Sequence, residues 1–318
     1  MRKKSWQTDW RMWKTYLRMC SRSAHDYDPT EVEEFYDWFI QDSAAEIFHG
    51  NIHWGYWQNG AKTIEEAADA IVDLLGESAQ IGEGEHCLDV GCGIGGPALR
   101  LAQRHHCHIT GLNISPAQIE KGRQLAEEAR EALEACGASV EFVFGDAMKM
   151  PFEPETFDHV YALDSMMHMN DKGRFIAEAS RVLKPGGKFT ILDFSLNFEF
   201  TGQERKRIER AQKLWRAPDP ISFGELTRFL EANGLEILIE KDLSEDFRQS
   251  MEAFEKTFSL LNVLARQRNF MKAIAREYTP LGLLLFKRIL DSLIDLKLFA
   301  NRTDVKMAYF LVTARKRG

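Results

Sequence analysis

The chain has 318 residues, of which 44% are hydrophobic and 28% charged, so it can bury a sizeable core. Its formal net charge of −7 disfavours a nucleic-acid partner, because neutralising phosphates needs a basic surface. No stretch approaches the roughly 18 uninterrupted apolar residues of a membrane span. The five cysteines include no C-x-x-C pair, so we expect no disulfide framework, no zinc site and a cytoplasmic protein.

Residues 1–60 are interpreted as a helical extension. Trp6, Trp10, Trp13 and Leu17 recur at helical spacing and therefore share one face, which Lys and Arg residues flank. We expect this helix to pack on the main domain as a lid. Contact with a membrane surface is the alternative.

Helix and strand patterns alternate between residues 63 and 193. Helices are predicted over 63–78, after the glycines at 91–96, from about 115 to 135, and over 171–183. Thr63 and Glu66 form the S/T-x-x-E pattern of a capping box. Short apolar strands are predicted over 86–90, 107–114, 140–145, 157–163 and 188–194. Such alternation indicates parallel pairing, so residues 61–194 are expected to form a doubly wound, Rossmann-like α/β core.

The alternation ends after Phe194. Residues 195–302 are interpreted as a mainly helical insertion that contains one core strand near LEILIE, and residues 303–318 as a closing strand. The insertion is rich in Leu, Phe and Met. Because it precedes the last strand, we expect it to roof a largely apolar acceptor pocket.

Residues 87–102 read CLDVGCGIGGPALRLA, in which Gly91, Gly93 and Gly96 satisfy G-x-G-x-x-G. This glycine loop follows the first strand, where an α/β sheet binds its ligand. NAD and S-adenosylmethionine fit the glycines equally well, but Asp89 separates them. A carboxylate there would repel a pyrophosphate, whereas the cofactor S-adenosylmethionine carries an ammonium and a sulfonium. The D-x-G-x-G-x-G spacing therefore favours S-adenosylmethionine.

Several motifs, in order along residues 50–193, resemble those of class I S-adenosylmethionine-dependent methyltransferases. They are DVGCGIGGPALRLA, GLNISPAQ, GDAMKMPF, FDHVYALDSMMHM and RVLKPGGKFTILDF, and the glycine motif resembles the variant of small-molecule, sterol and tocopherol methyltransferases. GNIHWGYW resembles the lead-in of macrolide-sugar O-methyltransferases. The resemblance implies that the sheet is mostly parallel and that its closing strand is antiparallel.

The resemblance also implies the cofactor residues. Asp89, Gly91 and Gly93 would hold the methionine end, and Asp146 the adenine amino group, although Asp146 alternatively caps a turn. Asn113 stands where the family usually has an acid that binds the ribose; an amide can still bond both hydroxyls. The remaining candidates for the cofactor site are Tyr36, Trp57, Ile114, Gln118, Ala147 and Asp164, with packing an equal explanation for the two aromatic residues.

Methyl transfer to a hydroxyl needs a proton acceptor, and His168 lies just past the fourth strand, where the methyl group should point. Asp193 ends the fifth strand and could orient His168 or bind substrate, or be purely structural. His53 and Met167 are candidate substrate contacts. His105, His106 and His108 are interpreted as surface residues, because a helix end running into a strand does not bring them together around a metal.

The function expected first is O-methylation of a hydroxylated polyketide, macrolide or terpenoid, with His168 as general base. The alternative is C-methylation of an isoprenoid or sterol-like alkene through a carbocation. Two further classes are disfavoured. A nicotinamide-dependent oxidoreductase conflicts with Asp89 and Asn113, and a non-catalytic module would need neither His168 nor an apolar roof. Homodimerisation stays open.

Overall fold

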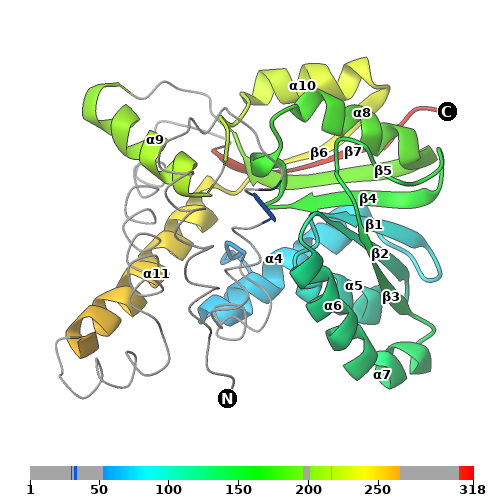
Figure 1. The fold of residues 1–318 in the computed structure, drawn as a ribbon, viewed down its shortest axis with the longest axis horizontal. Helices are drawn as coiled ribbons and strands as arrows, with labels where there is room; N and C mark the ends of the chain where they lie inside the picture. Colours follow the sequence, from blue (N-terminus) through cyan, green and yellow to red (C-terminus); the bar gives the residue numbers. More distant parts are fainter. Residues whose placement is uncertain (1–29, 31, 34–52, 196–200, 216, 266–307) are drawn as a thin grey trace.

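The computed structural model describes residues 30, 32–33, 53–195, 201–215, 217–265 and 308–318 (Figure 1). Within these residues the strands form one sheet in the order β3-β2-β1-β4-β5-β7-β6. The strands are β1 (His86–Val90), β2 (His108–Asn113), β3 (Ser139–Phe144), β4 (Phe157–Leu163), β5 (Leu183–Phe194), β6 (Leu235–Asp242) and β7 (Tyr309–Lys316). Strands β1 to β5 pair in parallel, and β7 lies antiparallel between β5 and β6. The predicted sheet is confirmed.

Helices cover both faces of the sheet (Figure 1). On one face, the hydrophobic core lies between the sheet and helices α4 (Ile64–Ala79), α5 (Gly96–His105) and α11 (Ser244–Ala265). On the other face, a second core lies between the sheet and helices α8 (Lys172–Val182) and α10 (Phe223–Ala232). Helices α6 (Pro116–Glu128) and α7 (Arg130–Ala135) pack near β3, and Ile208 of α9 (Gly202–Trp215) belongs to the same core cluster as α11. A 3-10 turn, η1 (Met166–His168), follows β4.

The carboxyl ends of the parallel strands carry the candidate site. Strands β2 and β3 lie on one side of β1, and β4 and β5 lie on its other side. The direction in which successive strands are added to the sheet therefore reverses between β1 and β4. Ligands of doubly wound sheets bind in the crevice at such a reversal. Helix α11 approaches this edge, because Phe247 packs against Phe194 at the end of β5 with ring centroids 4.9 Å apart.

Three local expectations differ from the structure. The helix predicted over 115–135 bends at Ala129, whose φ of −91° and ψ of −2° separate α6 from α7. Strand β5 begins at Leu183, before the Pro-Gly-Gly sequence, and its register against β4 shifts there. The capping box of α4 is only half formed, because Glu66 accepts the amide of Lys62 instead of that of Thr63. The N-terminal helix, Tyr36 and residues 266–307 lie outside the described residues.

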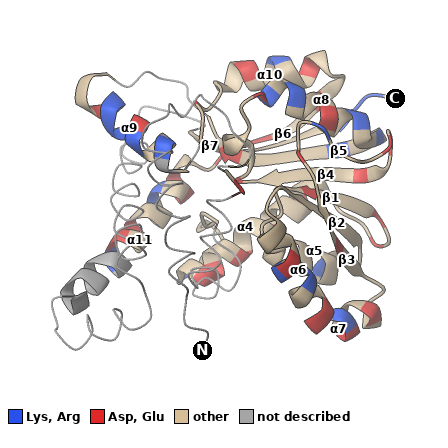
Figure 2. Cartoon of the chain, in the orientation of Figure 1, with Lys and Arg blue, Asp and Glu red and all other residues tan. Residues whose placement is uncertain are grey.

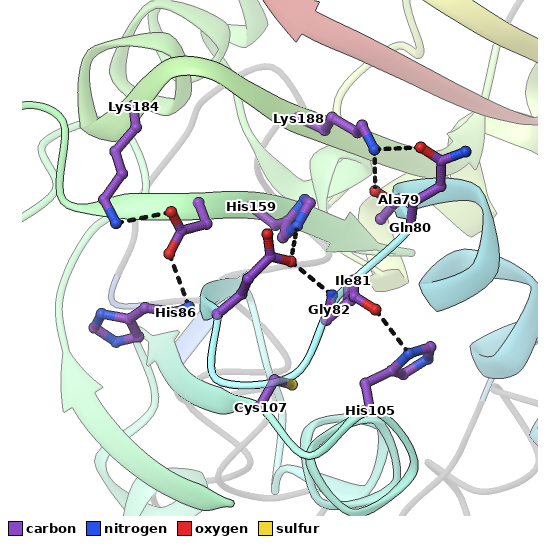
Figure 3. Close-up of polar contacts among 12 residues, drawn as sticks. Ala79, Gln80, Ile81, Gly82, His86, His105, Cys107, His159, Lys184 and Lys188 are labelled. Carbon is purple, nitrogen blue, oxygen red and sulfur yellow. Dashed lines mark hydrogen bonds and ion pairs between the residues drawn. The ribbon is translucent and has the colours of Figure 1, made fainter.

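The opposite edge of the sheet, at the amino ends of the strands, holds a separate polar network (Figure 3). His159 is bonded through Nε2 to Glu85 at 2.7 Å, and Glu85 also accepts the amide of Gly82. Lys184 is paired with Asp158 at 2.8 Å. These contacts join β4 and β5 to the turn between α4 and β1, far from the carboxyl ends. The network therefore belongs to the framework of the fold.

Helices α6, α9 and α10 carry charged residues of both signs, whereas α4 carries acidic residues and no basic one (Figure 2). Among the described helices, none is long and apolar enough to cross a membrane.

Candidate active site

The glycine loop after β1 presses directly against the turn that follows β4. Gly91 has φ +79°, and a Cβ built on it would lie 2.5 Å from Cβ of Ser165. Ser165 in turn donates from its hydroxyl to the carbonyl oxygen of Val90 at 2.6 Å. The amides of Gly91 and Cys92 both donate to Leu112, at the end of β2. Only glycine fits this position, because Ser165 occupies the space that a side chain would need.

Asp89, just before this loop, is a buried carboxylate with 2% of its surface exposed. Burial raises its pKa to about 7, and the nearby His53 opposes that rise. Within the described residues no cation is hydrogen-bonded to this carboxylate, so a ligand that brings a positive charge would stabilise it. The ammonium of S-adenosylmethionine is such a group. The residues present therefore fit the cofactor expected from the sequence.

Asn113, at the end of β2, braces the glycine loop. Its Nδ2 donates to the carbonyl oxygen of Gly93 at 3.1 Å and to Oε1 of Gln118 at 2.6 Å, while its Oδ1 accepts the amide of Ile114. A carboxylate could make neither donation. The neutral residue at this position thus has a structural reason, and the ribose role of Asn113 and Gln118 stays a prediction.

The third-strand loop places Asp146 and Ala147, both half-buried, after β3. Oδ1 of Asp146 accepts the amide of Met148 at 2.8 Å and so closes a tight turn. Turn capping occupies one carboxylate oxygen, which leaves Oδ2 for the predicted contact with the adenine amino group.

Asp164, directly after β4, connects two distant parts of the chain. Its Oδ2 is bonded to Nδ1 of His53 at 3.0 Å, and its Oδ1 accepts the hydroxyl of Tyr309 at 2.9 Å. The backbone of Asp164 has φ +51°, an unusual value for a residue with a side chain. Such strain is typical of residues held in place for function. Two predicted site residues, His53 and Asp164, are thereby brought together.

Asp193, at the end of β5, holds the turn that presents His168. Its Oδ2 accepts the amide of Met167 at 3.1 Å and its Oδ1 that of Phe194 at 2.7 Å. Burial, reinforced by the charge of Asp164, raises the pKa of Asp193 to about 7. Asp193 therefore contacts the turn that contains His168 through the amide of the preceding residue.

Trp57 is turned toward the helical insertion. Its indole nitrogen donates to the hydroxyl of Ser250 at 2.8 Å, and its amide donates to Asp246 at 2.7 Å. Sequence reasoning missed Asp246, Ser250, Ser165 and Tyr309. Ser165 lies within the motif FDHVYALDSMMHM, whereas Asp246, Ser250 and Tyr309 lie in none of the motifs, and all four contact segments that are distant in sequence.

The three histidines near residue 106 serve different elements. His105 is bonded to the carbonyl oxygen of Ile81 and His108 to the hydroxyl of Ser139, while His106 ends α5. In the described part of the chain no group of three His, Cys, Asp or Glu side chains is placed to hold a metal.

Comparison with known proteins agrees with this geometry. Residues 88–191 match the family described as a methyltransferase domain. O-methyltransferase cnsE of Penicillium expansum is 33% identical over 269 residues, covering 84% of this chain and 94% of that protein. The 27-O-demethylrifamycin SV methyltransferase of Amycolatopsis mediterranei (strain S699) is 33% identical over 240 residues, covering 75% and 86%. The crystal structure of the [4+2]-cyclase SpnF aligns with a TM-score of 0.70 at 30% identity, covering 90% of this chain and 95% of that one.

A doubly wound sheet with a glycine loop and a buried carboxylate at its reversal point is a Rossmann-like fold with its ligand site at that edge. Together with the relatives, these features show that the chain belongs to the class I S-adenosylmethionine-dependent methyltransferases. Its cofactor is S-adenosylmethionine, and the predicted family is confirmed.

Proposed function

We propose that this methyltransferase methylates a hydroxyl oxygen of a largely apolar natural product, with His168 as the general base. The observation that carries the proposal is the turn Met166–His168, which Asp193 holds at the carboxyl edge of the sheet beside the glycine loop. The named O-methyltransferases among the relatives support oxygen as the methylated atom.

The bound cofactor supplies an electrophilic methyl group on a sulfonium, and the acceptor oxygen must lose its proton as it is methylated. Nδ1 of His168 is fully enclosed by protein, so we assign Nε2 as the atom that takes this proton. Asp193 keeps the imidazole in place through the amide of Met167. Alignment of the acceptor oxygen with the methyl group supplies much of the remaining rate.

An aromatic cluster next to the site supports an apolar acceptor. The ring centroid of Trp54 lies 4.9 Å from that of Phe247, 5.6 Å from that of Phe254 and 6.2 Å from that of Phe194, all edge-on. Because Phe194 ends β5, this cluster stands at the same edge as Asp193. Phe194, Phe247 and Phe254 are buried, so Trp54, which is half-buried, is the ring of this cluster that can contact a polyketide, macrolide or terpenoid skeleton.

Two measurements test the proposal. Titration calorimetry with S-adenosylhomocysteine should show micromolar binding, and NAD should give no heat. Transfer of labelled methyl from S-adenosylmethionine is then screened against hydroxylated polyketides, macrolides and terpenoids, with sterol-like alkenes in parallel.

The variant His168→Ala should bind S-adenosylhomocysteine normally and lose methyl transfer by about 10²–10⁴-fold, the range expected for a general base. Full activity of His168→Ala would show that His168 is not the base. Methyl transfer by the wild-type protein to an alkene only would also contradict this role, and either result would favour carbocation chemistry.

A further inference from the structure

Residues 53–58, which we call the lead-in segment, are held against the helical insertion. They run from His53 at the active site to Gln58 near the start of α4, and α11 provides most of their polar partners. The contacts cross about 190 residues of chain, as in the bond from Trp57 to Asp246 with a separation of 189. Helix α11 follows β6 within residues 195–302, the insertion expected to roof the acceptor.

Asp246 is completely buried and binds the end of the lead-in segment. Its Oδ1 accepts the amides of Trp57 at 2.7 Å and Gln58 at 3.3 Å, and its Oδ2 accepts the side-chain amide of Gln58 at 2.7 Å. A buried carboxylate that accepts three N–H groups is well compensated for its desolvation. Asp246 therefore fixes two consecutive residues of the segment.

Ser250 lies one helical turn further along α11 and is also buried. Its hydroxyl oxygen accepts the amide of Gly55 at 2.9 Å and the indole N–H of Trp57 at 2.8 Å, and it donates to the carbonyl oxygen of Asp246. One hydroxyl thus uses both its donor and its acceptor capacity. It ties backbone and side chain of the segment to the same point on α11.

The segment has no room to move toward α4. A Cβ on Gly55 would lie 2.3 Å from Cβ of Ala67, and the amide of Tyr56 donates to the carbonyl oxygen of Ala67 at 2.8 Å. On the other side Nζ of Lys241, in β6, donates to the hydroxyl of Tyr56 at 2.9 Å. The segment is therefore fixed between α4, β6 and α11.

The front end of the segment enters the cofactor site. His53 is bonded to Asp164 at 3.0 Å and is close enough to Asp89 to favour its ionised form. The amide of Gly55, two residues along the chain, is fixed to Ser250, so the backbone of His53 stays within about 7 Å of that anchor. Contacts on α11 are thus transmitted to the end of β1.

We propose that Asp246 and Ser250 are positioning residues of the cofactor site: by fixing the lead-in segment on α11 they hold His53 against Asp164, beside Asp89. Cofactor binding and the placement of the acceptor-side helix α11 are thereby linked. The inference rests on the methyltransferase reading of the site and on its cofactor, and it is independent of the acceptor and of the role given to His168.

The test is a double-mutant cycle on the dissociation constant of S-adenosylhomocysteine, measured by calorimetry with Ser250→Ala, Trp57→Phe and the double variant. Trp57→Phe, which removes one hydrogen bond, should weaken binding by about tenfold, and Ser250→Ala, which also removes the acceptor of the Gly55 amide, by at least as much. The double variant should bind no more weakly than the weaker single variant, because both remove the same link. Ser180→Ala is the matched control, since this buried serine also donates to a carbonyl oxygen, that of Asn233, away from the site.

The control separates positioning from general stability. Both serine variants should lower the melting temperature, but only Ser250→Ala should change the affinity. Unchanged affinity in Ser250→Ala, or equal losses in Ser250→Ala and Ser180→Ala, would overturn the inference. Strictly additive losses would mean that Trp57 touches the cofactor directly and would also overturn it. Failure of the wild-type protein to bind S-adenosylhomocysteine would instead contradict the cofactor assignment and, with it, this inference.

Discussion

The side-chain amide of Asn113 donates to the carbonyl oxygen of Gly93 at 3.1 Å, so the end of β2 holds the glycine loop of β1. Asn113→Asp replaces this donor with a carboxylate that faces a carbonyl oxygen. Gln118 can rotate its amide to donate to the new carboxylate, but Gly93 cannot. We expect a loss of about 1–3 kcal/mol in the free energy of unfolding, the cost of an unpaired buried polar group.

Urea unfolding of Asn113→Asp measures this loss. The exposed Asn170 provides the control, since Asn170→Asp should stay within about 0.5 kcal/mol of the wild type. Equal stability of the two variants would show that the Asn113 contact does not hold the loop.

Cofactor affinity should depend on pH through Asp89. Its pKa of about 7 means that the unliganded carboxylate is largely protonated at pH 6, whereas binding an ammonium favours its ionised form. Affinity for S-adenosylhomocysteine should therefore rise by about tenfold from pH 6 to pH 8 and then level off. Calorimetry across this range gives the profile.

Two variants assign that profile to one residue. Asp89→Asn should bind more weakly and without the pH dependence, whereas Asp193→Asn should keep it, although the pKa of Asp193 is also raised to about 7. A wild-type profile that is flat between pH 6 and pH 8 would contradict the assignment of Asp89 to the ammonium.

Gly91 and Gly186 share a φ of +79° but differ in their surroundings. A Cβ on Gly91 meets Ser165 at 2.5 Å, and a Cβ on Gly186 meets nothing within 4 Å. Gly186→Ala should therefore cost only the backbone strain, about 1–2 kcal/mol. Gly91→Ala should cost about 1–3 kcal/mol more through the steric clash and should abolish binding of S-adenosylhomocysteine.

Thermal unfolding and calorimetry on the two alanine variants make the comparison. If Gly91→Ala were no less stable than Gly186→Ala and bound the ligand normally, the loop and the turn after β4 would not be in close contact.

The network at the amino edge of the sheet should make the fold sensitive to acid. Burial lowers the pKa of His159, which is bonded to Glu85 (Figure 3). The native state then binds fewer protons than the unfolded state, whose histidine pKa is about 6.5, so stability falls as pH decreases below that value.

The pH slope of the unfolding free energy, measured in urea between pH 7 and pH 5, tests this origin. His159→Gln should flatten the slope, and His106→Asn, at an exposed helix end, should leave it as it is. A slope unaffected by His159→Gln would place the acid sensitivity elsewhere.

Sequence reasoning captured what local patterns determine. Apolar strands alternating with helices predict the parallel sheet. The carboxyl ends of parallel strands meet at one edge of such a sheet. The residues at those ends, Asp89, Asn113, Asp164 and Asp193, are therefore expected at one site. The partners of those residues followed no local rule. Asp164 takes His53 and Tyr309, at separations of 111 and 145 residues, because tertiary packing selects them. The bend at Ala129 was not predicted either, because alanine is a strong helix former and does not mark the end of a helix.

Strand β7 completes the sheet late in the chain, since β6 joins it only through β7. Phe194 is in register with Tyr309, so β7, the second neighbour of β5, is synthesised more than a hundred residues after β5. Contacts of this sequence separation slow folding, because the conformational entropy of the long loop is lost before the contacts that stabilise the closed state have formed. On a nascent chain, the glycine loop and the first strands can assemble early, but Asp164 gains its hydroxyl partner only when Tyr309 has been synthesised. Maturation of the active centre is therefore tied to the last step of folding.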